Sequence, residues 1–396
     1  MLTICKGASD QEARNGTSAA GSPAAGQEDD GLAAMVKADL HVHLVGSAAP
    51  HTVAALAAHH PDSGVPASPG ELLAFFRFRD FAHFLQVYGA VSDLVRTPQD
   101  IVTLVEGLAA DMRAQGTAYA EVTVTPVSHA RAGIPAADLA QALDTGAAAA
   151  RAAGVELAWV YDINGRDGQP GAQRTLDAAL LHPPAALAGF GLGGPEAGVP
   201  RADFRDAFAR ARAAGLHSVP HAGESTGPGE IWAAVDELGA ERVGHGIAAA
   251  GDPRLLERLR ERQITLEICP SSNVATGVVP ALGAHPLPRL LAAGVRVVLG
   301  TTTRRCSAPR CSRNTGAPVT TWAWTPASSV PWPGPALTPA SPPLPSSNGC
   351  CGSRPDPKLV LSRLAAQRPS RTRAVITPRG GRFCREAGSL DRRCRL

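Results

Sequence analysis

Short apolar segments alternate with longer segments rich in Ala, Leu and Arg between Lys37 and Gly300. Short apolar runs flanked by Gly, Pro and polar residues are typical of buried strands, and the longer segments have helical spacing. Repeated strand–helix units form a parallel sheet, and eight of them close into a (β/α)8 barrel. We therefore expect an α/β TIM barrel with strands over Ala38–Leu44, Ala118–Thr125, Val155–Ile163, Ala188–Gly193, His217–Ala222, Arg242–Ile247, Thr265–Cys269 and Arg296–Gly300.

A long helical region separates the first two predicted strands and contains the aromatic stretch Phe75–Phe84. Active sites of such barrels lie at the C-terminal ends of the strands, beside the segments that follow them. The aromatic stretch is therefore expected to form a lid or a wall of the binding pocket.

The barrel pattern has clear limits along the chain, and it predicts a domain over residues 35–300. Residues 1–34 are rich in Ala, Gly, Ser and Gln without periodicity, which predicts a disordered leader. Residues 301–396 hold 16 basic and only 3 acidic residues, a net charge of +13, whereas residues 1–300 carry −10. The later segment also holds six of the eight cysteines. It is expected to be an aberrant, disordered tail rich in Pro, Arg and Cys, so that the eighth helix of the barrel is missing or replaced.

Composition narrows the class of protein. The chain of 396 residues is 44% hydrophobic, which suffices for a large core. It has neither an apolar run of about 18 residues nor a basic-then-apolar start, so the expected location is the cytoplasm, with no membrane partner. The basic tail could be an arm for nucleic acid. We expect no such partner, because arginines scattered among Trp, Cys and Pro are also typical of a GC-rich gene translated in the wrong frame.

The first predicted strand carries two histidines, His41 and His43, at its C-terminal end. Side chains two residues apart on a strand share a face, so both imidazoles point the same way. Such a pair is half of a zinc or iron site.

The fifth and sixth predicted strands end in further polar side chains that could complete this site. His221 ends the fifth strand, Glu224 follows it, and His245 ends the sixth within Gly-His-Gly. In a closed apolar pocket the carboxyl pKa of such a Glu rises, which suits it to proton transfer. Taken singly, each residue has a simpler interpretation: an ordinary strand pair, a buried histidine, or a carboxylate near a helix N-terminus. Their placement on one rim of the barrel favours a functional site. The remaining histidines that we considered, His83, His129, His217 and His285, lack this support and are expected to be structural or on the surface.

Residues 37–300 resemble the adenosine deaminase family of metal-dependent amidohydrolases. The resemblance rests on segments in the family's order and approximate spacing: Lys37–Ser47, Tyr119-Ala-Glu-Val, Gly189–Gly194, His221-Ala-Gly-Glu224, Arg242-Val-Gly-His245-Gly and Leu266–Asn273. It implies that His41, His43 and His221 bind Zn²⁺, that Glu224 protonates the purine ring, and that His245 orients the attacking hydroxide. The backbone of Gly194 would contact the purine, and the partner would be a small purine nucleoside.

Val45 departs from the family pattern. Adenosine deaminases usually place an acidic residue two positions after the second histidine, where it contacts the 5′ hydroxyl of the nucleoside. Valine makes no such hydrogen bond, which suits a nucleoside with a bulkier, less polar 5′ group. The deaminase of aminodeoxyfutalosine, a menaquinone precursor with an aromatic acid at that end, is one branch with such a substrate. Neutral drift, with adenosine still accepted, is the alternative.

Thr302 is the second departure. After its last strand the family has Asp-Asp-Pro, and the first Asp completes the metal site, whereas this chain has Thr302-Thr303-Arg304. A shift of one base from codon 301 makes these codons compatible with Asp-Asp-Pro. We therefore hypothesise that one nucleotide has been lost there. Resequencing of the gene tests this, and an intact reading frame would refute it. We expect a zinc-dependent deaminase of adenosine or a 5′-modified adenosine that is impaired as written. The alternatives are an aminodeoxyfutalosine deaminase and an inactive zinc-binding remnant.

Overall fold

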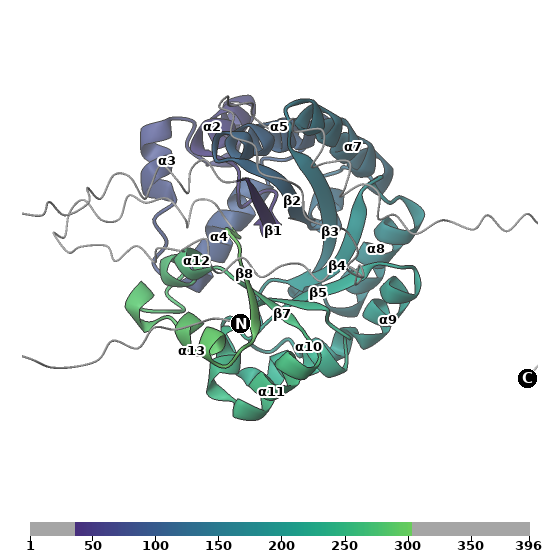
Figure 1. Cartoon of the computed structure of the whole chain (residues 1–396). Coiled ribbons are helices and arrows are strands. Elements are labelled where there is room, and N and C mark those ends of the chain that lie inside the picture. The colour runs from purple at the N-terminus through teal and green to yellow at the C-terminus, as the bar shows by residue number, and fades with distance from the viewer. Residues whose placement is uncertain (1–35, 303–396) are drawn as a thin grey trace, which may run out of the picture. The chain divides into compact units, whose positions relative to one another are not determined.

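Eight parallel strands form the centre of the molecule in the computed structural model, which describes residues 36–302 (Figure 1). The strands are neighbours in chain order: β1 (Lys37–His43), β2 (Thr117–Val124), β3 (Glu156–Asn164), β4 (Leu187–Gly193), β5 (His217–Ala222), β6 (Arg242–His245), β7 (Thr265–Ile268) and β8 (Arg296–Leu299). All eight predicted strands are confirmed, each within two residues at either end. The TIM-barrel prediction is confirmed with them.

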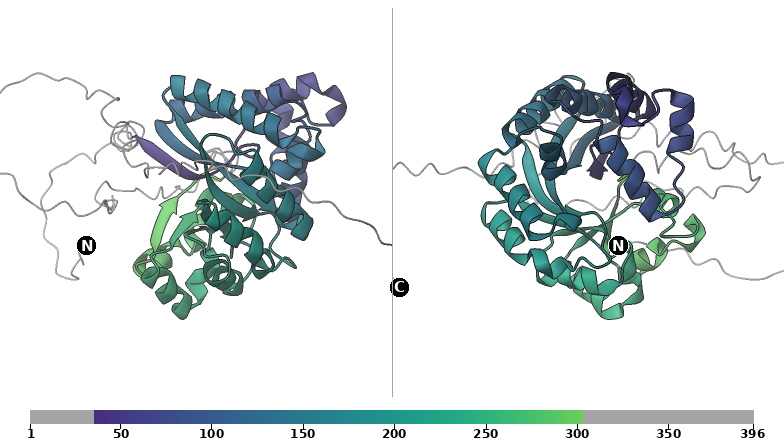
Figure 2. Two further views of the ribbon diagram at one scale, coloured as in Figure 1. Left: turned by 90° about the vertical axis from the view of Figure 1, so that its right-hand side faces the viewer. Right: turned by 180° about the vertical axis from the view of Figure 1, so that it is seen from behind.

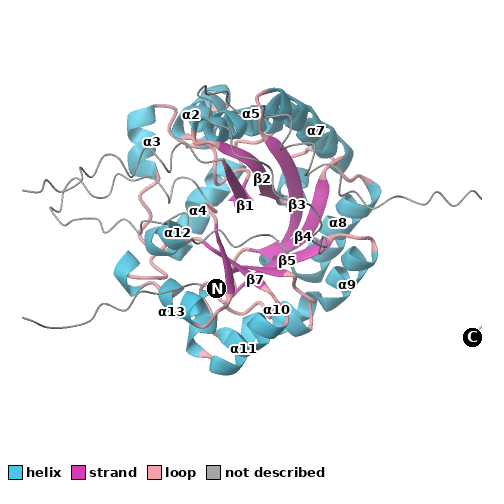
Figure 3. Cartoon of the chain, in the orientation of Figure 1, coloured by secondary structure: helices cyan, strands magenta, loops and turns pink. Residues whose placement is uncertain are grey.

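Helices surround the strands, as Figure 3 shows by colour and Figure 2 from two further sides. The α-helices are α2 (Pro50–His59), α3 (Pro69–Phe75), α4 (Phe81–Ser92), α5 (Pro98–Ala114), α6 (Pro126–Arg131), α7 (Ala136–Ala152), α8 (Gly168–Leu181), α9 (Arg205–Ala213), α10 (Pro228–Asp236), α11 (Pro253–Glu261), α12 (Pro270–Ala275) and α13 (Leu287–Ala292). Short 3-10 turns are η1 (Pro61–Ser63), η2 (Gly165–Asp167), η3 (Arg201–Phe204), η4 (Ile247–Gly251) and η5 (Leu282–Ala284).

Helix α5 illustrates how the sequence sets these elements. Thr97 caps its first turn reciprocally with Asp100, and Pro98 occupies the first helical position, where a missing N–H costs nothing. Its apolar residues recur every three to four positions, and one face buries Ile101, Leu104 and Leu108 against the barrel. The core therefore lies between the strands and the surrounding helices.

The barrel closes where the chain beyond β8 meets β1. Thr302 forms a parallel bridge with Val42. The Thr302 N–H donates to the His41 carbonyl at 2.7 Å, and the His43 N–H donates to the Thr302 carbonyl at 2.9 Å. Position 302 therefore lies directly beside the two histidines of β1.

Two sequence predictions concern segments outside the described residues, namely the leader over 1–34 and the tail beyond Thr302. They stay predictions, as does the missing eighth helix. Within residues 36–302, the outer face of β8 is the part that such a helix would cover, and Leu299 is 52% exposed there. Over the same range, every helix is too short or too polar to cross a lipid bilayer.

Candidate metal centre and active site

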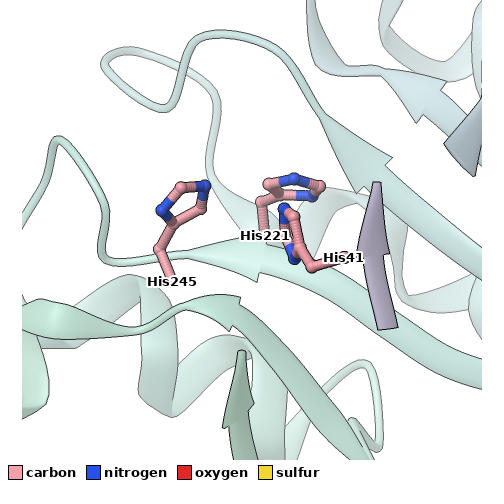
Figure 4. A group of neighbouring side chains, drawn as sticks. All are labelled: His41, His221 and His245. Carbon is pink, nitrogen blue, oxygen red and sulfur yellow. The ribbon is translucent and has the colours of Figure 1, made fainter. Parts of the chain in front are cut away.

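Four imidazoles converge at the C-terminal ends of the strands: His41 and His43 from β1, His221 from β5 and His245 from β6. Ring nitrogens of His41, His221 and His245 all lie within 4.8 Å of one another, and Figure 4 shows these rings facing one point. The Nε2 atoms of His43 and His221 are 3.1 Å apart. The structure thus brings together every histidine that the sequence placed at the site.

Hydrogen bonds at Nδ1 fix the orientation of two of these rings. The Nδ1–H of His41 donates to Glu267 Oε2 at 2.8 Å, and Nδ1–H of His221 donates to the Leu192 carbonyl at 3.1 Å. Both rings therefore turn Nε2 into the site, as is typical of metal-binding histidines. Among the described residues, His41 Nε2 has no hydrogen-bond partner although it is buried. A buried, unpaired lone pair of this kind fits a metal ligand.

Burial also keeps these histidines neutral. Loss of hydration, and then the neighbouring imidazoles, lower the pKa of His41 and His221 well below the usual value, and burial lowers the pKa of His43 to about 4. Neutral imidazoles have a free lone pair, which protonated ones lack. The donor set therefore fits a divalent metal at neutral pH. Gly244 makes room for the His41 and His221 rings, because a Cβ at this position would lie 2.8 Å from the first ring and 3.1 Å from the second.

An ion network supports His41 from inside the barrel. Glu267 is buried and accepts from Arg242 Nε at 2.5 Å, while the other end of this guanidinium pairs with Glu121. An unpaired buried carboxylate would be costly, and Arg242 offsets that cost. The network thereby provides a carboxylate to hold His41.

Glu224 lies in the turn after β5, with one oxygen 3.5 Å from His245 Nδ1. Burial, and then the negative charge of Glu196, raise the pKa of Glu224 to about 8. This carboxyl is therefore protonated at neutral pH, the direction expected from the sequence. Glu196 also holds the turn in place, because it accepts the backbone N–H groups of Glu224, Ser225 and Thr226 at 3.0 to 3.1 Å.

A chain of hydrogen bonds assigns the proton on His245. The Leu287 N–H donates to His285 Nδ1 at 3.0 Å, so the neutral His285 ring carries its proton on Nε2, which donates to Asn273 Oδ1 at 3.1 Å. The Asn273 amide NH2 then faces Glu224 Oε1 at 3.4 Å and His245 Nδ1 at 3.0 Å. Because His245 Nδ1 accepts, its Nε2 carries the proton. Figure 4 shows the second ring nitrogen of His245 pointing towards His221.

Two backbone conformations at the site are unusual. His245 has φ of 60° and buried Thr302 has φ of 46°. The left-handed region is disfavoured for side chains with a Cβ, most of all for β-branched ones, whereas Asn, Asp and His tolerate it best. The conformation of Thr302 thus fits the Asp that the family pattern places there better than it fits threonine.

One cavity of about 570 Å³ contains these groups. His43, His221, Glu224, His245, Gly194 and Thr302 all line it. Phe81, Phe84 and Tyr88 of α4 form one wall. The predicted aromatic wall is therefore confirmed for the end of the stretch Phe75–Phe84, whereas Phe75 and Phe76 pack against the core. Val45 is buried behind that wall, where it lines a small second cavity with Phe84 and Tyr88.

A model of the adenosine deaminase family matches residues 36–316. The chain belongs to the adenosine deaminase family. It is 49% identical over 271 residues to an aminodeoxyfutalosine deaminase of Streptomyces coelicolor, covering 68% of this chain and 70% of the relative. An adenine deaminase of the same organism is 35% identical over 267 residues, which is 67% of this chain and 78% of the relative.

Solved structures agree in fold. The adenine deaminase from Arthrobacter aurescens superposes with a TM-score of 0.64 at 30% identity, over 67% of this chain and 81% of that one. An amidohydrolase from Burkholderia ambifaria with bound zinc superposes with a TM-score of 0.65 at 27% identity, over 72% of this chain and 79% of that one. This chain thus has the fold of the metal-dependent amidohydrolases, with a cluster of histidines at the C-terminal ends of its strands that could hold a metal ion.

Several supporting residues carry no signal in the sequence that predicts their role: Glu267, Arg242, Asn273, His285 and Glu196. The first three lie inside segments that resemble the family, but nothing local shows which way they point. His285 was expected to be structural or on the surface. It is buried and acts on the site only through Asn273, twelve positions away in sequence.

Proposed function

We propose that this chain hydrolytically deaminates a 6-aminopurine nucleoside carrying an aromatic acid at its 5′ carbon, of which aminodeoxyfutalosine is the example. The observation that carries the deamination is the position of the Glu224 carboxyl, 3.5 Å from His245 and beside the other imidazoles, where burial raises its pKa to about 8. The 49% identity to an aminodeoxyfutalosine deaminase supports this substrate over plain adenosine. The aromatic wall on α4, with Val45 packed behind it, agrees with a less polar 5′ group.

His41, His43 and His221 would hold the metal through nitrogens that are neutral and directed inward, and three histidines are a donor set that suits zinc. When bound, zinc lowers the pKa of a coordinated water towards about 7 and so provides hydroxide at neutral pH.

The other side chains act on the purine and on the attacking water. Glu224 donates its proton to a ring nitrogen, which makes the carbon that bears the amino group electrophilic. His245 donates from Nε2 to the attacking oxygen and thereby orients it. The backbone of Gly194 lines the cavity and would contact the purine. The proton of the added hydroxyl then passes to the amino group, the C–N bond breaks and ammonia leaves, which forms the 6-oxopurine. Glu224 regains its proton from water.

Thr302 supports a second candidate, a zinc-binding protein without turnover. Its hydroxyl is a poor zinc ligand and cannot act as a base, so we expect the present chain to be impaired. Ammonia release with zinc present separates the two candidates, because a protein without turnover releases none.

Substrate preference tests the proposed function. With zinc added, kcat/KM is expected to be at least about tenfold higher for aminodeoxyfutalosine than for adenosine, because the α4 wall gives the 5′ substituent apolar contact that adenosine lacks. Release of ammonia from each nucleoside measures this ratio. A preference for adenosine would refute the proposed substrate.

His285→Phe is expected to lower kcat by about tenfold to a hundredfold with little change in KM, because Asn273 loses the donor that fixes its amide. His285→Gln can still donate to Asn273 Oδ1 and should retain most activity. The ring ¹⁵N shifts of His245 provide a second readout, since they report which nitrogen carries the proton. Unchanged shifts in His285→Phe would contradict the assignment of the His245 tautomer.

A further inference from the structure

The cavity has a composition that deamination itself does not require. It is lined by the histidines and Glu224, which are buried or half-buried, and also by the more exposed Asp93 and three arginines, Arg96, Arg131 and Arg166. A volume of about 570 Å³ lies within the range of cavities that enclose extended small molecules. The same cavity can therefore hold a purine beside the histidines and a further group near the arginines.

Helix α4 adds an aromatic surface to the same cavity, and this surface begins beside His43. The Tyr88 ring lies 6.5 Å from the His43 ring, the Phe84 ring 6.0 Å from Tyr88, and the Phe81 ring 5.8 Å from Phe84, all between centroids. The spacing of three and four residues keeps these rings on one helical face. Such a surface favours an aryl group, which gains from stacked or edge-to-face contact as well as from burial.

The three arginines differ in what they already bind. Arg96 Nη1 lies 3.0 and 3.1 Å from the two oxygens of Asp62, and Arg131 pairs with Asp167 at 2.5 Å. The exposed side chain of Arg166 has no ion-pair partner within residues 36–302.

The backbone at Arg166 is nevertheless fixed. Its N–H donates to the Asn164 side chain at 3.2 Å, at the start of η2 and just after β3. Arg166 is thus an anchored residue at the cavity mouth with an uncommitted guanidinium, which can grip a carboxylate with two parallel hydrogen bonds.

We propose that Arg166 and the α4 rings Phe81, Phe84 and Tyr88 form a subsite for an aryl carboxylate attached to the 5′ carbon of the bound nucleoside. This inference rests on the proposed function and adds the residues that recognise the substituent. The aryl ring packs along α4 and its carboxylate pairs with Arg166. An anion without an aryl group, such as a 5′-phosphate, would use the arginine but not the rings.

Binding to the full chain with zinc added tests the subsite independently of turnover. The ligands are 6-oxopurine nucleosides, which cannot be deaminated: futalosine, which carries the aryl carboxylate, its methyl ester, inosine and inosine 5′-phosphate. Arg166→Gln is expected to weaken futalosine binding by about tenfold or more in calorimetry, because a charge-assisted pair is lost. Binding of the ester and of inosine should not change. Arg174→Gln, which removes an exposed arginine of α8 that does not line the cavity, is the matched control and should change nothing.

Phe84→Leu separates the two halves of the subsite. It is expected to weaken the binding of futalosine and of its methyl ester equally, and to leave the binding of inosine unchanged. Equal losses for the acid and the ester in Arg166→Gln would overturn the role of Arg166. A loss in Phe84→Leu as large for the 5′-phosphate as for the acid would overturn the role of the rings. If the wild-type chain prefers aminodeoxyfutalosine but Arg166→Gln binds futalosine normally, the subsite is wrong and the proposed function stands. If the wild-type chain prefers adenosine, the proposed function itself is wrong.

Discussion

Thr302→Asp is expected to raise kcat/KM for deamination by at least about a hundredfold. The position is buried, lines the cavity and is tied by backbone hydrogen bonds to His41 and His43, so a carboxylate there would enter the site beside the imidazoles. It would add an oxygen ligand for a metal and a base for the attacking water, and threonine provides neither. Ammonia release with saturating zinc measures the gain.

Thr302→Asn is the matched control for this variant. Asn, like Asp, tolerates the left-handed backbone at φ of 46° better than threonine does, so Thr302→Asn should raise the free energy of unfolding by up to about 1 kcal/mol. Only Asp should raise activity and tighten zinc binding. An equal gain in activity from Asn would assign the defect of this chain to backbone strain. No gain from Asp would place the defect elsewhere and refute the role given to position 302.

The strands and the reacting residues could be predicted because their signals are local. Each strand is a short apolar run, and a barrel brings the ends of its strands together whatever the helices between them do. His41, His43, His221 and His245 could therefore be placed on one rim before any contact was known. The place of Thr302 beside them followed from its position just after the last strand.

The supporting contacts could not be predicted in this way, since they join residues distant in sequence. His41 and Glu267 are 226 positions apart, and Arg242 and Glu121 are 121 apart. Val45 is a second example of a residue whose place could not be predicted. Its change from an acidic residue was visible, but its place behind the α4 wall was not. Its apolar side chain therefore lies behind Phe84 and Tyr88 and does not line the main cavity itself.

Glu224→Gln is expected to lower kcat by a factor of about 10² to 10⁴, the usual loss for a general acid. The effect is best measured in the Thr302→Asp background, where more activity is left to lose. Glutamine keeps the size of the side chain and can still contact a ring nitrogen, but it has no proton to transfer. Glu257→Gln removes an exposed carboxylate on α11 and should leave kcat unchanged. A loss below about tenfold for Glu224→Gln would refute the role of Glu224 as the acid.

The same substitution should reveal the raised pKa of Glu224 in the stability of the metal-free protein. A carboxyl with a pKa of about 8 when folded, against its usual value of 4.5, stays protonated in the native state while the unfolded chain ionises. Its contribution to stability is complete below pH 4.5 and is lost as the pH rises to about 8. Over that interval the wild-type chain should lose up to about 1.4 kcal/mol per pH unit relative to Glu224→Gln, which cannot ionise. Denaturant unfolding of both proteins at several pH values gives this difference, and a constant difference would mean that Glu224 ionises normally and is no acid at neutral pH.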